Sequence, residues 1–191
     1  MIDLLQVAGD VQAFCDSQGW RSCIIGGIAL QRWGETRVTR DVDLTLLTGF
    51  DQEGPFVEAL LAQYTARITD AALFAHRSRV LLLQSQEGIG IDVSLGALPY
   101  EELVVSRATD FSFGPGLSLR TCSAEDLLVM KLFAFRPLDL RDAESIALRN
   151  HRQLDWVYVE RHLRPLAELK EEPGIMRELA RLKDVPAYPP E

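Results

Sequence analysis

Residues 25–43 read IGGIALQRWGETRVTRDVD, and this stretch decides the predicted fold. The apolar run 23–25 is typical of a buried strand, which ends at a pair of glycines in a tight turn. Residues 28–33 follow as a short helix. Residues 41–47, DVDLTLL, alternate between polar and apolar side chains and predict a second strand. The predicted order is therefore strand, glycine turn, helix, basic loop and strand.

The sequence on either side predicts an α+β fold, in which a mixed β-sheet flanked by helices is followed by a C-terminal helical subdomain. In the first part, apolar spacing predicts helices over 4–18 and 54–64, a hairpin formed by 79–84 and 89–95, and a short strand over 117–120. Later residues are helical almost throughout, over 124–135, 139–150, 156–170 and 175–183. We therefore expect an α/β core over residues 1–121 and a helical subdomain over residues 122–191.

The composition is that of an ordinary globular protein: of 191 residues, 47% are hydrophobic and 25% are charged. A formal net charge of −8 argues against a general nucleic-acid-binding protein that depends on many phosphate contacts. No apolar run approaches the ~18 residues that cross a bilayer, so we expect no membrane partner. The three cysteines are odd in number and lack metal-ligand spacing, which indicates reduced thiols in a cytoplasmic protein.

Asp41 and Asp43 are the first candidate functional residues. Side chains alternate along a strand, so these two carboxylates project from the same face about 6–7 Å apart. They repel each other unless a cation lies between them, and Mg²⁺ prefers such hard oxygen ligands. Asp92 lies in the β-rich run 90–94 and suits the same cation, because a charge on the core face of a strand is costly. The plain alternatives are a turn cap or a solvated aspartate for the pair, and the outer face of an edge strand for Asp92.

Candidate phosphate contacts precede the aspartates. Gly26 and Gly27 end a strand and open a helix, where the absence of a side chain and the unpaired helix N–H groups favour an approaching anion. Arg37, Thr39 and Arg40 lead directly into the first aspartate and add hydrogen-bond donors and positive charge. A simple tight turn and a solvated loop are the plain alternatives for these two groups.

The whole stretch 25–43 resembles the signature of the DNA polymerase beta-type nucleotidyltransferase superfamily, and it is most similar to the AbiEii/AbiGii-type toxin branch. That branch has a Gly-Gly followed by Ala-Leu, then a glycine, an Arg-x-Thr or Arg-x-Ser, and a D-x-D. The gap of thirteen residues between Gly27 and Asp41 fits this branch. More typical members of the superfamily carry a serine where this chain has Gly27, so a hydroxyl that would contact the phosphate is absent at this position.

The resemblance implies a nucleotidyltransferase-like fold and a role for each motif residue. Asp41 and Asp43 would hold two Mg²⁺ ions, for which Mn²⁺ can substitute. Asp92 would complete the metal site and accept the proton of the acceptor. Gly26 and Gly27 would contact the triphosphate of a nucleotide such as ATP. The implied reaction is in-line attack by an acceptor hydroxyl on the α-phosphorus, with pyrophosphate leaving.

The resemblance also implies partners. A nucleoside triphosphate would be the donor, bound between the two parts of the chain, and a tRNA, a protein or a small molecule would be the acceptor. A toxin of this branch belongs to a toxin–antitoxin pair, which implies an antitoxin protein. Two alternatives stay open: a small-molecule enzyme of the aminoglycoside adenylyltransferase type, and an inactive nucleotide-binding or partner-binding module that has kept the fold.

The helical part contributes further candidates. Residues 127–135 are apolar except at Lys131, so this ammonium needs an anion, either a triphosphate or a carboxylate, unless it reaches solvent past its neighbours. Asp126 pairs with Ser123 as a helix cap, which favours a structural role over catalysis. Asp142 is expected to hold Lys131 or the base or ribose of the nucleotide, with an ordinary surface ion pair as the alternative. We therefore add Lys131 and Asp142 to the expected nucleotide-binding residues.

Overall fold

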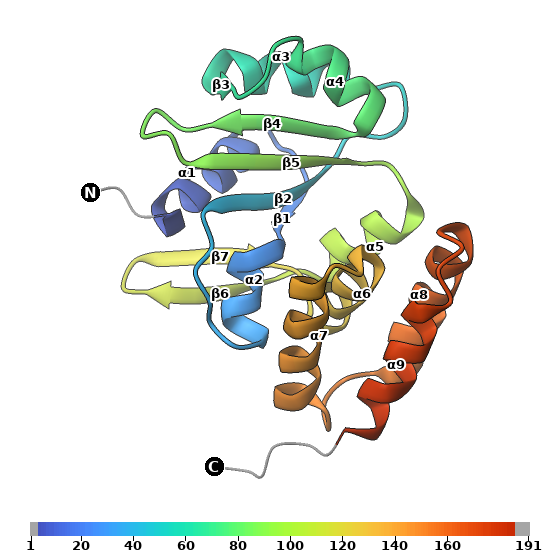
Figure 1. Cartoon of the computed structure of the whole chain (residues 1–191). Helices are drawn as coiled ribbons and strands as arrows, with labels where there is room; N and C mark the ends of the chain where they lie inside the picture. The colour runs from blue at the N-terminus through green and yellow to red at the C-terminus, as the bar shows by residue number, and fades with distance from the viewer. Residues whose placement is uncertain (1–3, 186–191) are drawn as a thin grey trace. The chain divides into compact units, whose positions relative to one another are not determined.

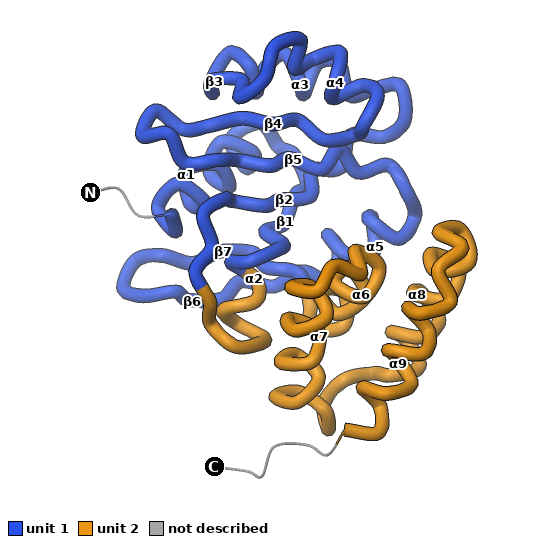
Figure 2. Tube along the Cα trace, viewed as in Figure 1, with its two compact units in different colours: residues 1–28, 38–122 blue, residues 29–37, 123–191 orange. Residues whose placement is uncertain are grey.

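The computed structural model describes residues 4–185, which pack as two compact units (Figure 1, Figure 2). Unit 1 comprises the residues up to Ile28 together with Val38–Cys122, and unit 2 comprises Ala29–Arg37 together with the residues from Ser123 onward. The boundary between Cys122 and Ser123 lies one residue beyond the division that the sequence analysis places after residue 121. The stretch 29–37, by contrast, leaves the α/β part of the chain and packs with the helices of unit 2.

Unit 1 contains the strands of the described chain and the helices that cover them. Along the sequence, its elements are α1 (Leu4–Ser17), β1 (Ser22–Ile24), β2 (Asp41–Leu47), α3 (Gly54–Gln63), β3 (Thr65–Ala66), α4 (Ala71–Ser78), β4 (Val80–Gln84), β5 (Gly90–Gly96), α5 (Pro99–Arg107), β6 (Thr109–Gly114) and β7 (Leu117–Thr121). Helix α2 (Gly26–Trp33) begins in unit 1 and continues in unit 2. Unit 2 is otherwise formed by α6 (Ala124–Ala134), α7 (Pro137–Asn150), α8 (Trp156–Leu169) and α9 (Gly174–Asp184).

The strands form one mixed sheet in the order β3-β4-β5-β2-β1-β7-β6 (Figure 1). β2 runs parallel to β5 and β1 runs parallel to β7, whereas the other neighbouring strands are antiparallel. The predicted hairpin is confirmed, because β4 and β5 pair antiparallel. The predicted mixed sheet flanked by helices is likewise confirmed, and its central parallel pair, β2 with β5, carries the three aspartates that the sequence analysis singles out.

The two faces of this sheet differ in chemistry. Along β2, Val42, Leu44 and Leu46 are at most 1% exposed and belong to the core. The core also contains apolar side chains of α1, α3 and α4, so these helices cover one face of the sheet. Because side chains alternate along a strand, Asp41 and Asp43 lie on the opposite face, where α5 packs against β2. The acidic side chains therefore occupy the face that the main core does not use.

Helix α6 is the centre of unit 2, and α7, α8 and α9 all pack against it. Four of its apolar side chains are fully buried: Leu127, Leu128, Val129 and Leu132. The helix ends at Phe135, which adopts a left-handed backbone conformation with φ of 60°. Burial on every side of α6 explains why its sequence is apolar all round rather than amphipathic.

The stretch 29–37 is held in unit 2 by α7. Asn150 Nδ2 donates to the carbonyl of Trp33 at 2.6 Å, and Arg149 donates to the carbonyl of Gly34. The contact is close because Gly34 has no side chain: a Cβ there would lie 2.5 Å from Ser145 Oγ. A glycine at this position therefore lets the end of α2 approach α7.

The three cysteines are buried and form no disulfide bond: Cys15, Cys23 and Cys122. Burial raises the pKa of Cys15 to about 11, so this thiol stays protonated at neutral pH and is a poor nucleophile. Within residues 4–185, no helix has both the length and the apolar character that a membrane span requires.

Candidate functional site

The three predicted metal-ligating aspartates lie on one face of the β2–β5 pair. In the parallel register, Asp43 lies directly opposite Asp92, and Asp41 lies opposite Gly90. All three aspartates are partly exposed, whereas Val42 and Val93, their neighbours along the strands, are fully buried. The structure therefore brings together, on adjacent strands, carboxylates that are far apart in the sequence.

A guanidinium lies between two of these carboxylates. Arg67 Nη1 is 3.9 Å from Asp41 Oδ1, and Arg67 Nη2 donates a hydrogen bond to Asp92 Oδ1. Gly90 makes room for this arrangement, because a Cβ there would lie 2.2 Å from Asp41 Oδ1 and 3.0 Å from Arg67 Nη1. The sequence analysis does not single out Arg67, which follows the two-residue strand β3 in a stretch without recognisable periodicity.

Asp92 has a perturbed protonation equilibrium. Burial raises its pKa above the usual value for an aspartate, the positive charge of Arg67 opposes this shift, and the negative charge of Asp41 adds to it. Burial disfavours the charged form of any carboxylate, and a second carboxylate nearby acts in the same direction. Asp92 is consequently a stronger base than an ordinary solvent-exposed aspartate.

The glycine pair lies against Asp43 and Thr39. Gly26 adopts a left-handed conformation with φ of 61°, and a Cβ at this position would lie only 2.1 Å from Asp43 Oδ2. The turn is fixed to β2 by a hydrogen bond of 2.9 Å from the N–H of Ile25 to the carbonyl of Asp43. At Gly27, a Cβ would lie 2.4 Å from Thr39 Oγ1. Two glycines are therefore required where the start of α2 meets Asp43 and Thr39.

The carboxylate face fits a divalent cation in its donor chemistry. Asp41, Asp43 and Asp92 offer hard oxygen ligands from one face of two adjacent strands, which suits Mg²⁺. Within residues 4–185, no three histidine, cysteine or acidic side chains are already grouped closely enough to hold a metal ion. The Arg67 guanidinium lies between the Asp41 and Asp92 carboxylates and makes an ion pair with each.

The predicted residues of unit 2 form a second, buried charge cluster. Lys131 Nζ lies 3.1 Å from Asp139 Oδ1 and 2.7 Å from Asp142 Oδ2, and Lys131 is only 7% exposed. Arg37 donates two hydrogen bonds of 2.9 Å to the two oxygens of Asp142. The anion that Lys131 needs is thus a pair of carboxylates. Lys131 is therefore buried and does not reach solvent past its neighbours, and Asp142 is not part of an exposed surface ion pair.

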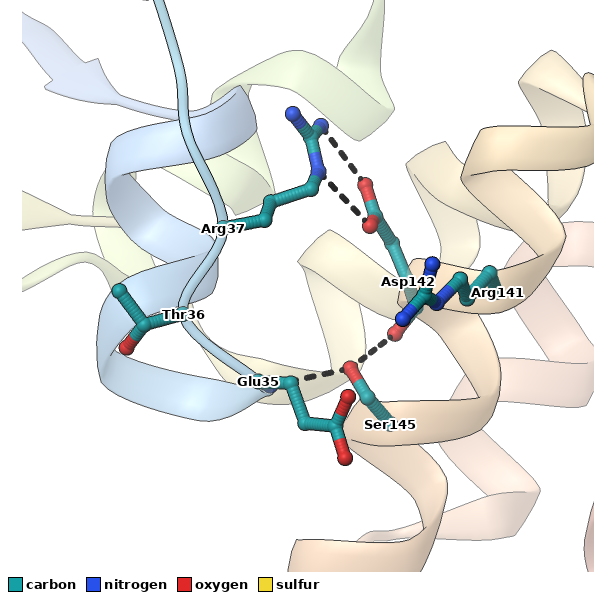
Figure 3. Close-up of a pocket in the computed structure, with 6 residues that line it drawn as sticks. All are labelled: Glu35, Thr36, Arg37, Arg141, Asp142 and Ser145. Atoms are coloured by element: carbon teal, nitrogen blue, oxygen red, sulfur yellow. Dashed lines mark hydrogen bonds and ion pairs between the residues drawn. The ribbon is translucent and has the colours of Figure 1, made fainter.

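A small polar cavity of about 70 Å³ adjoins Asp142 (Figure 3). Its walls also carry the Ser145 hydroxyl, which accepts a hydrogen bond from the N–H of Glu35 at 3.2 Å and donates to the carbonyl of Asp142 at 2.8 Å. Pockets that hold small-molecule ligands have volumes of roughly 300–1,000 Å³. The cavity is therefore too small for a nucleotide. The residues that line it are Glu35, Thr36, Arg37, Arg141, Asp142 and Ser145.

Asp126 has the structural role that the sequence analysis favours. Ser123 Oγ accepts a hydrogen bond from the N–H of Asp126 at 3.1 Å, which caps the N-terminus of α6. The Asp126 carboxylate is fully buried and accepts hydrogen bonds from the hydroxyls of Ser123 and Tyr158, each at 2.7 Å. This carboxylate ties the start of α6 to α8.

The sequence-predicted site residues therefore fall into two groups. The aspartates and the phosphate candidates belong to unit 1: Gly26, Gly27, Thr39, Arg40, Asp41, Asp43 and Asp92. Of these, Arg40 is exposed. The remaining three, Arg37, Lys131 and Asp142, belong to unit 2, where Asp142 pairs with both Arg37 and Lys131.

A family model described as "Nucleotidyl transferase AbiEii toxin, Type IV TA system" matches residues 24–181 of the chain. A comparison with curated proteins finds no match. Among solved structures, the chain is similar to an antigenic nucleotidyltransferase-like protein from Paracoccidioides brasiliensis, with a TM-score of 0.51 and 17% identity over 93% of this chain and 92% of that chain. It is also similar to the antibiotic-resistance factor ANT(2'')-Ia, with a TM-score of 0.52 and 15% identity over 94% of this chain and 88% of that chain. At these identities, the two structures show a shared fold alone.

Proposed function

The chain belongs to the AbiEii family of nucleotidyl transferase toxins, and from this premise we propose that it transfers a nucleoside monophosphate from a nucleoside triphosphate to a hydroxyl of a tRNA or protein, with Mg²⁺ as cofactor. Family membership makes the protein a nucleotidyltransferase. The observation that supports the assignment of the site is the pairing of Asp43 with Asp92 across β2 and β5, with Asp41 on the same face.

We propose that Asp41, Asp43 and Asp92 hold two Mg²⁺ ions. Their carboxylate oxygens are the ligands that Mg²⁺ prefers, and Mn²⁺ accepts the same ligands. When bound, such ions supply positive charge that stabilises the attacking and the leaving oxygen of an in-line displacement. Displacement of the Arg67 guanidinium from between Asp41 and Asp92 is then a requirement for binding the cation.

Gly26 and Gly27 are proposed to bind the triphosphate of the donor. They are the first residues of α2, where backbone N–H groups have no partner within the helix, and they carry no side chain that would keep a phosphate away. Thr39 Oγ1 lies 2.4 Å from the position of a Cβ at Gly27, so its hydroxyl occupies the space that a serine side chain would take there. We infer that Thr39 supplies the phosphate-binding hydroxyl that Gly27 lacks. Arg40 adds positive charge from an exposed position.

Asp92 is proposed to accept the proton of the attacking hydroxyl. The Asp92 carboxylate lies opposite Asp43 on the face proposed to bind the metal and the donor, where an acceptor hydroxyl would have to approach. The acceptor oxygen then forms a bond to the α-phosphorus, the bond from the α-phosphorus to the bridging oxygen breaks, and pyrophosphate leaves.

For unit 2, we propose that Arg37, Lys131 and Asp142 contribute to nucleotide binding. Lys131 is saturated by two carboxylates, so its role is to fix Asp142 in place. The side chain of Arg37 is 29% exposed and is oriented by its two hydrogen bonds to Asp142. Among these three residues, Arg37 is therefore the one that can reach a phosphate group while it stays attached to Asp142.

The family also indicates a partner, because an AbiEii toxin is one half of a toxin–antitoxin system. We propose that this chain has a cognate antitoxin, that ATP is among the donors to test, and that the protein acts in the cytoplasm. Nucleoside triphosphates and tRNA are both available in that compartment.

The proposal is tested with donors labelled at a defined phosphate. The protein is incubated with Mg²⁺, with total tRNA or total cell protein, and with each nucleoside triphosphate labelled at either the α- or the γ-phosphate. The expected result is label on tRNA or protein from the α-labelled donor alone, with no label once EDTA has removed the metal.

Other outcomes contradict the proposal in distinct ways. Label from the γ-labelled donor would indicate phosphoryl transfer. Label on an added aminoglycoside but on no macromolecule would indicate a small-molecule enzyme. Nucleotide binding without label on any acceptor would indicate an inactive module.

A further inference from the structure

The backbone places Arg67, which directly follows β3, in line with residues of three strands. The N–H of Arg67 donates to the carbonyl of Leu82 on β4 at 3.0 Å, and Leu82 pairs with Asp92 on β5. Asp92 in turn pairs with Asp43 on β2. Arg67 is thus anchored at the sheet position from which its side chain extends over β4 toward the carboxylate face.

The guanidinium at the end of that side chain bridges two strands. One nitrogen donates to Asp92 on β5, and the other lies 3.9 Å from Asp41 on β2. The side chain is 28% exposed, so the bridge is only partly shielded from solvent. Gly90 permits this bridge, because any larger residue would place a Cβ 3.0 Å from Arg67 Nη1.

The charges explain why an arginine is found at this position. Asp41 and Asp92 lie on neighbouring strands of one face, and two carboxylates so close destabilise each other unless a positive charge lies between them. Arg67 supplies that charge from within the chain. A divalent cation bound by the same two carboxylates requires the space and the electrostatic role that the guanidinium already fills.

We propose that Arg67 is a positioning residue, an internal counter-ion that holds Asp41 and Asp92 in place in the metal-free enzyme and is displaced when the divalent cation binds. This inference rests on the proposed function, because it takes Asp41 and Asp92 to be metal ligands. Cation and guanidinium therefore compete for the same carboxylates. The enzyme without metal keeps a neutralised and ordered site, at the expense of metal affinity.

The competition predicts opposite effects on metal affinity and on stability when Arg67 is removed. Arg67→Ala should bind Mn²⁺ more tightly, by about tenfold, because a competing charge next to two carboxylates is gone. In EDTA, the same variant should unfold at a lower temperature than the wild type. In saturating Mn²⁺, this difference in unfolding temperature should disappear. Arg67→Lys keeps the positive charge and should have an affinity closer to that of the wild type.

The test measures Mn²⁺ binding by the electron paramagnetic resonance signal of the free ion, with thermal unfolding recorded in EDTA and in saturating Mn²⁺. Arg77→Ala is the matched control, because Arg77 is an exposed arginine of α4 in the same unit. It should leave Mn²⁺ affinity unchanged. Asp43→Asn, alone and combined with Arg67→Ala, identifies binding at the carboxylate face, because it should abolish that binding in both backgrounds.

The outcomes separate this inference from the proposed function. Wild-type protein that binds Mn²⁺ in an Asp43-dependent manner, with equal or weaker binding by Arg67→Ala, would overturn the role of Arg67 and leave the proposed function standing. If neither the wild type nor Arg67→Ala binds Mn²⁺ in an Asp43-dependent manner, both the role of Arg67 and the proposed function are overturned. If Arg67 has a purely structural role, Arg67→Ala should lower the unfolding temperature equally with and without Mn²⁺. That result also contradicts the inference. Asp43-dependent binding that appears only in Arg67→Ala would support it.

Discussion

Asp43 and Asp92 lie directly opposite each other where β2 pairs in parallel with β5. This register is held by the apolar face, because Val42 and Val93 are fully buried on the opposite side of the same strands. A slip of either strand by one residue would turn its carboxylate into the core and its valine toward solvent. Burial of valine and leucine side chains therefore aligns the two aspartates.

Gly26→Ala is expected to abolish nucleotidyl transfer and to destabilise the fold. A Cβ at this position would lie 2.1 Å from Asp43 Oδ2, and the φ of 61° is unfavourable for any residue with a side chain. Moving Asp43 to relieve this contact would displace a proposed metal ligand. The loss of unfolding free energy should exceed about 2 kcal/mol, measured by urea denaturation.

Gly19→Ala is the matched control for this variant. Gly19 also has a positive φ, 69°, but a Cβ there would have no heavy atom within 4 Å. It should show only the backbone strain, about 1 kcal/mol, and full transfer activity. Equal behaviour of the two variants would mean that the contact with Asp43 has no consequence.

Lys131→Met is expected to destabilise the protein by about 1–3 kcal/mol, because Asp139 and Asp142 lose their shared buried cation and keep only Arg136 and Arg37 as partners. Arg164→Ala provides the comparison. Arg164 pairs with Glu160 on the surface and is 54% exposed, so its removal should change stability by less than about 1 kcal/mol. Urea denaturation of both variants measures the difference. Similar losses would show that the buried cluster is not a stabilising element.

Glu53 is expected to make stability depend on pH in the acidic range. The hydrogen bond with His76, supported by a backbone hydrogen bond and by Arg79, lowers the pKa of Glu53 to about 2 from the ordinary 4.5. Between these two values the unfolded chain binds more protons than the folded chain, so stability falls as the pH falls through this window. Above it, the contribution of Glu53 is fully present.

Glu53→Gln removes this dependence. The difference in unfolding free energy between wild type and variant should be constant near neutral pH and should shrink below about pH 4.5, as measured by urea denaturation. A difference that stays constant across the acidic range would contradict the assignment. His76 Nδ1 and Arg79 Nη1 lie 3.0 Å and 3.1 Å from the two Glu53 oxygens, which is the geometry that the prediction depends on.

The elements with strong periodicity could be predicted from the sequence, and those without it could not. The alternation of β2 and the apolar spacing of the later helices identify these segments, because a buried face leaves a repeating pattern. Helix α4 is short and exposes Leu73 and Phe74, so its apolar residues follow no single face. Strand β6 is exposed along most of its length, which removes the alternation that reveals a strand.

The candidate site shows the same division between local and long-range information. The need of Lys131 for an anion follows from its apolar neighbours in the sequence. The identity of that anion depends on how α7 packs against α6, so the choice between carboxylates and a triphosphate stays open at the level of sequence. Arg67 is 25 residues from Asp92, and only the order β3-β4-β5-β2 brings it to the aspartates.

The most direct test of the central claim compares α-labelled nucleotide transfer by the wild type with that by Asp43→Asn, with thermal unfolding in EDTA as the check on folding. Ser94→Ala is the matched control, because Ser94 lies two residues beyond Asp92 on the same face of β5. The account predicts that Asp43→Asn loses transfer by at least about 100-fold while its unfolding temperature is unchanged or higher, since one of several neighbouring negative charges is removed. Ser94→Ala should keep full activity. If a folded Asp43→Asn protein transfers the nucleotide at the rate of the wild type, the account is contradicted.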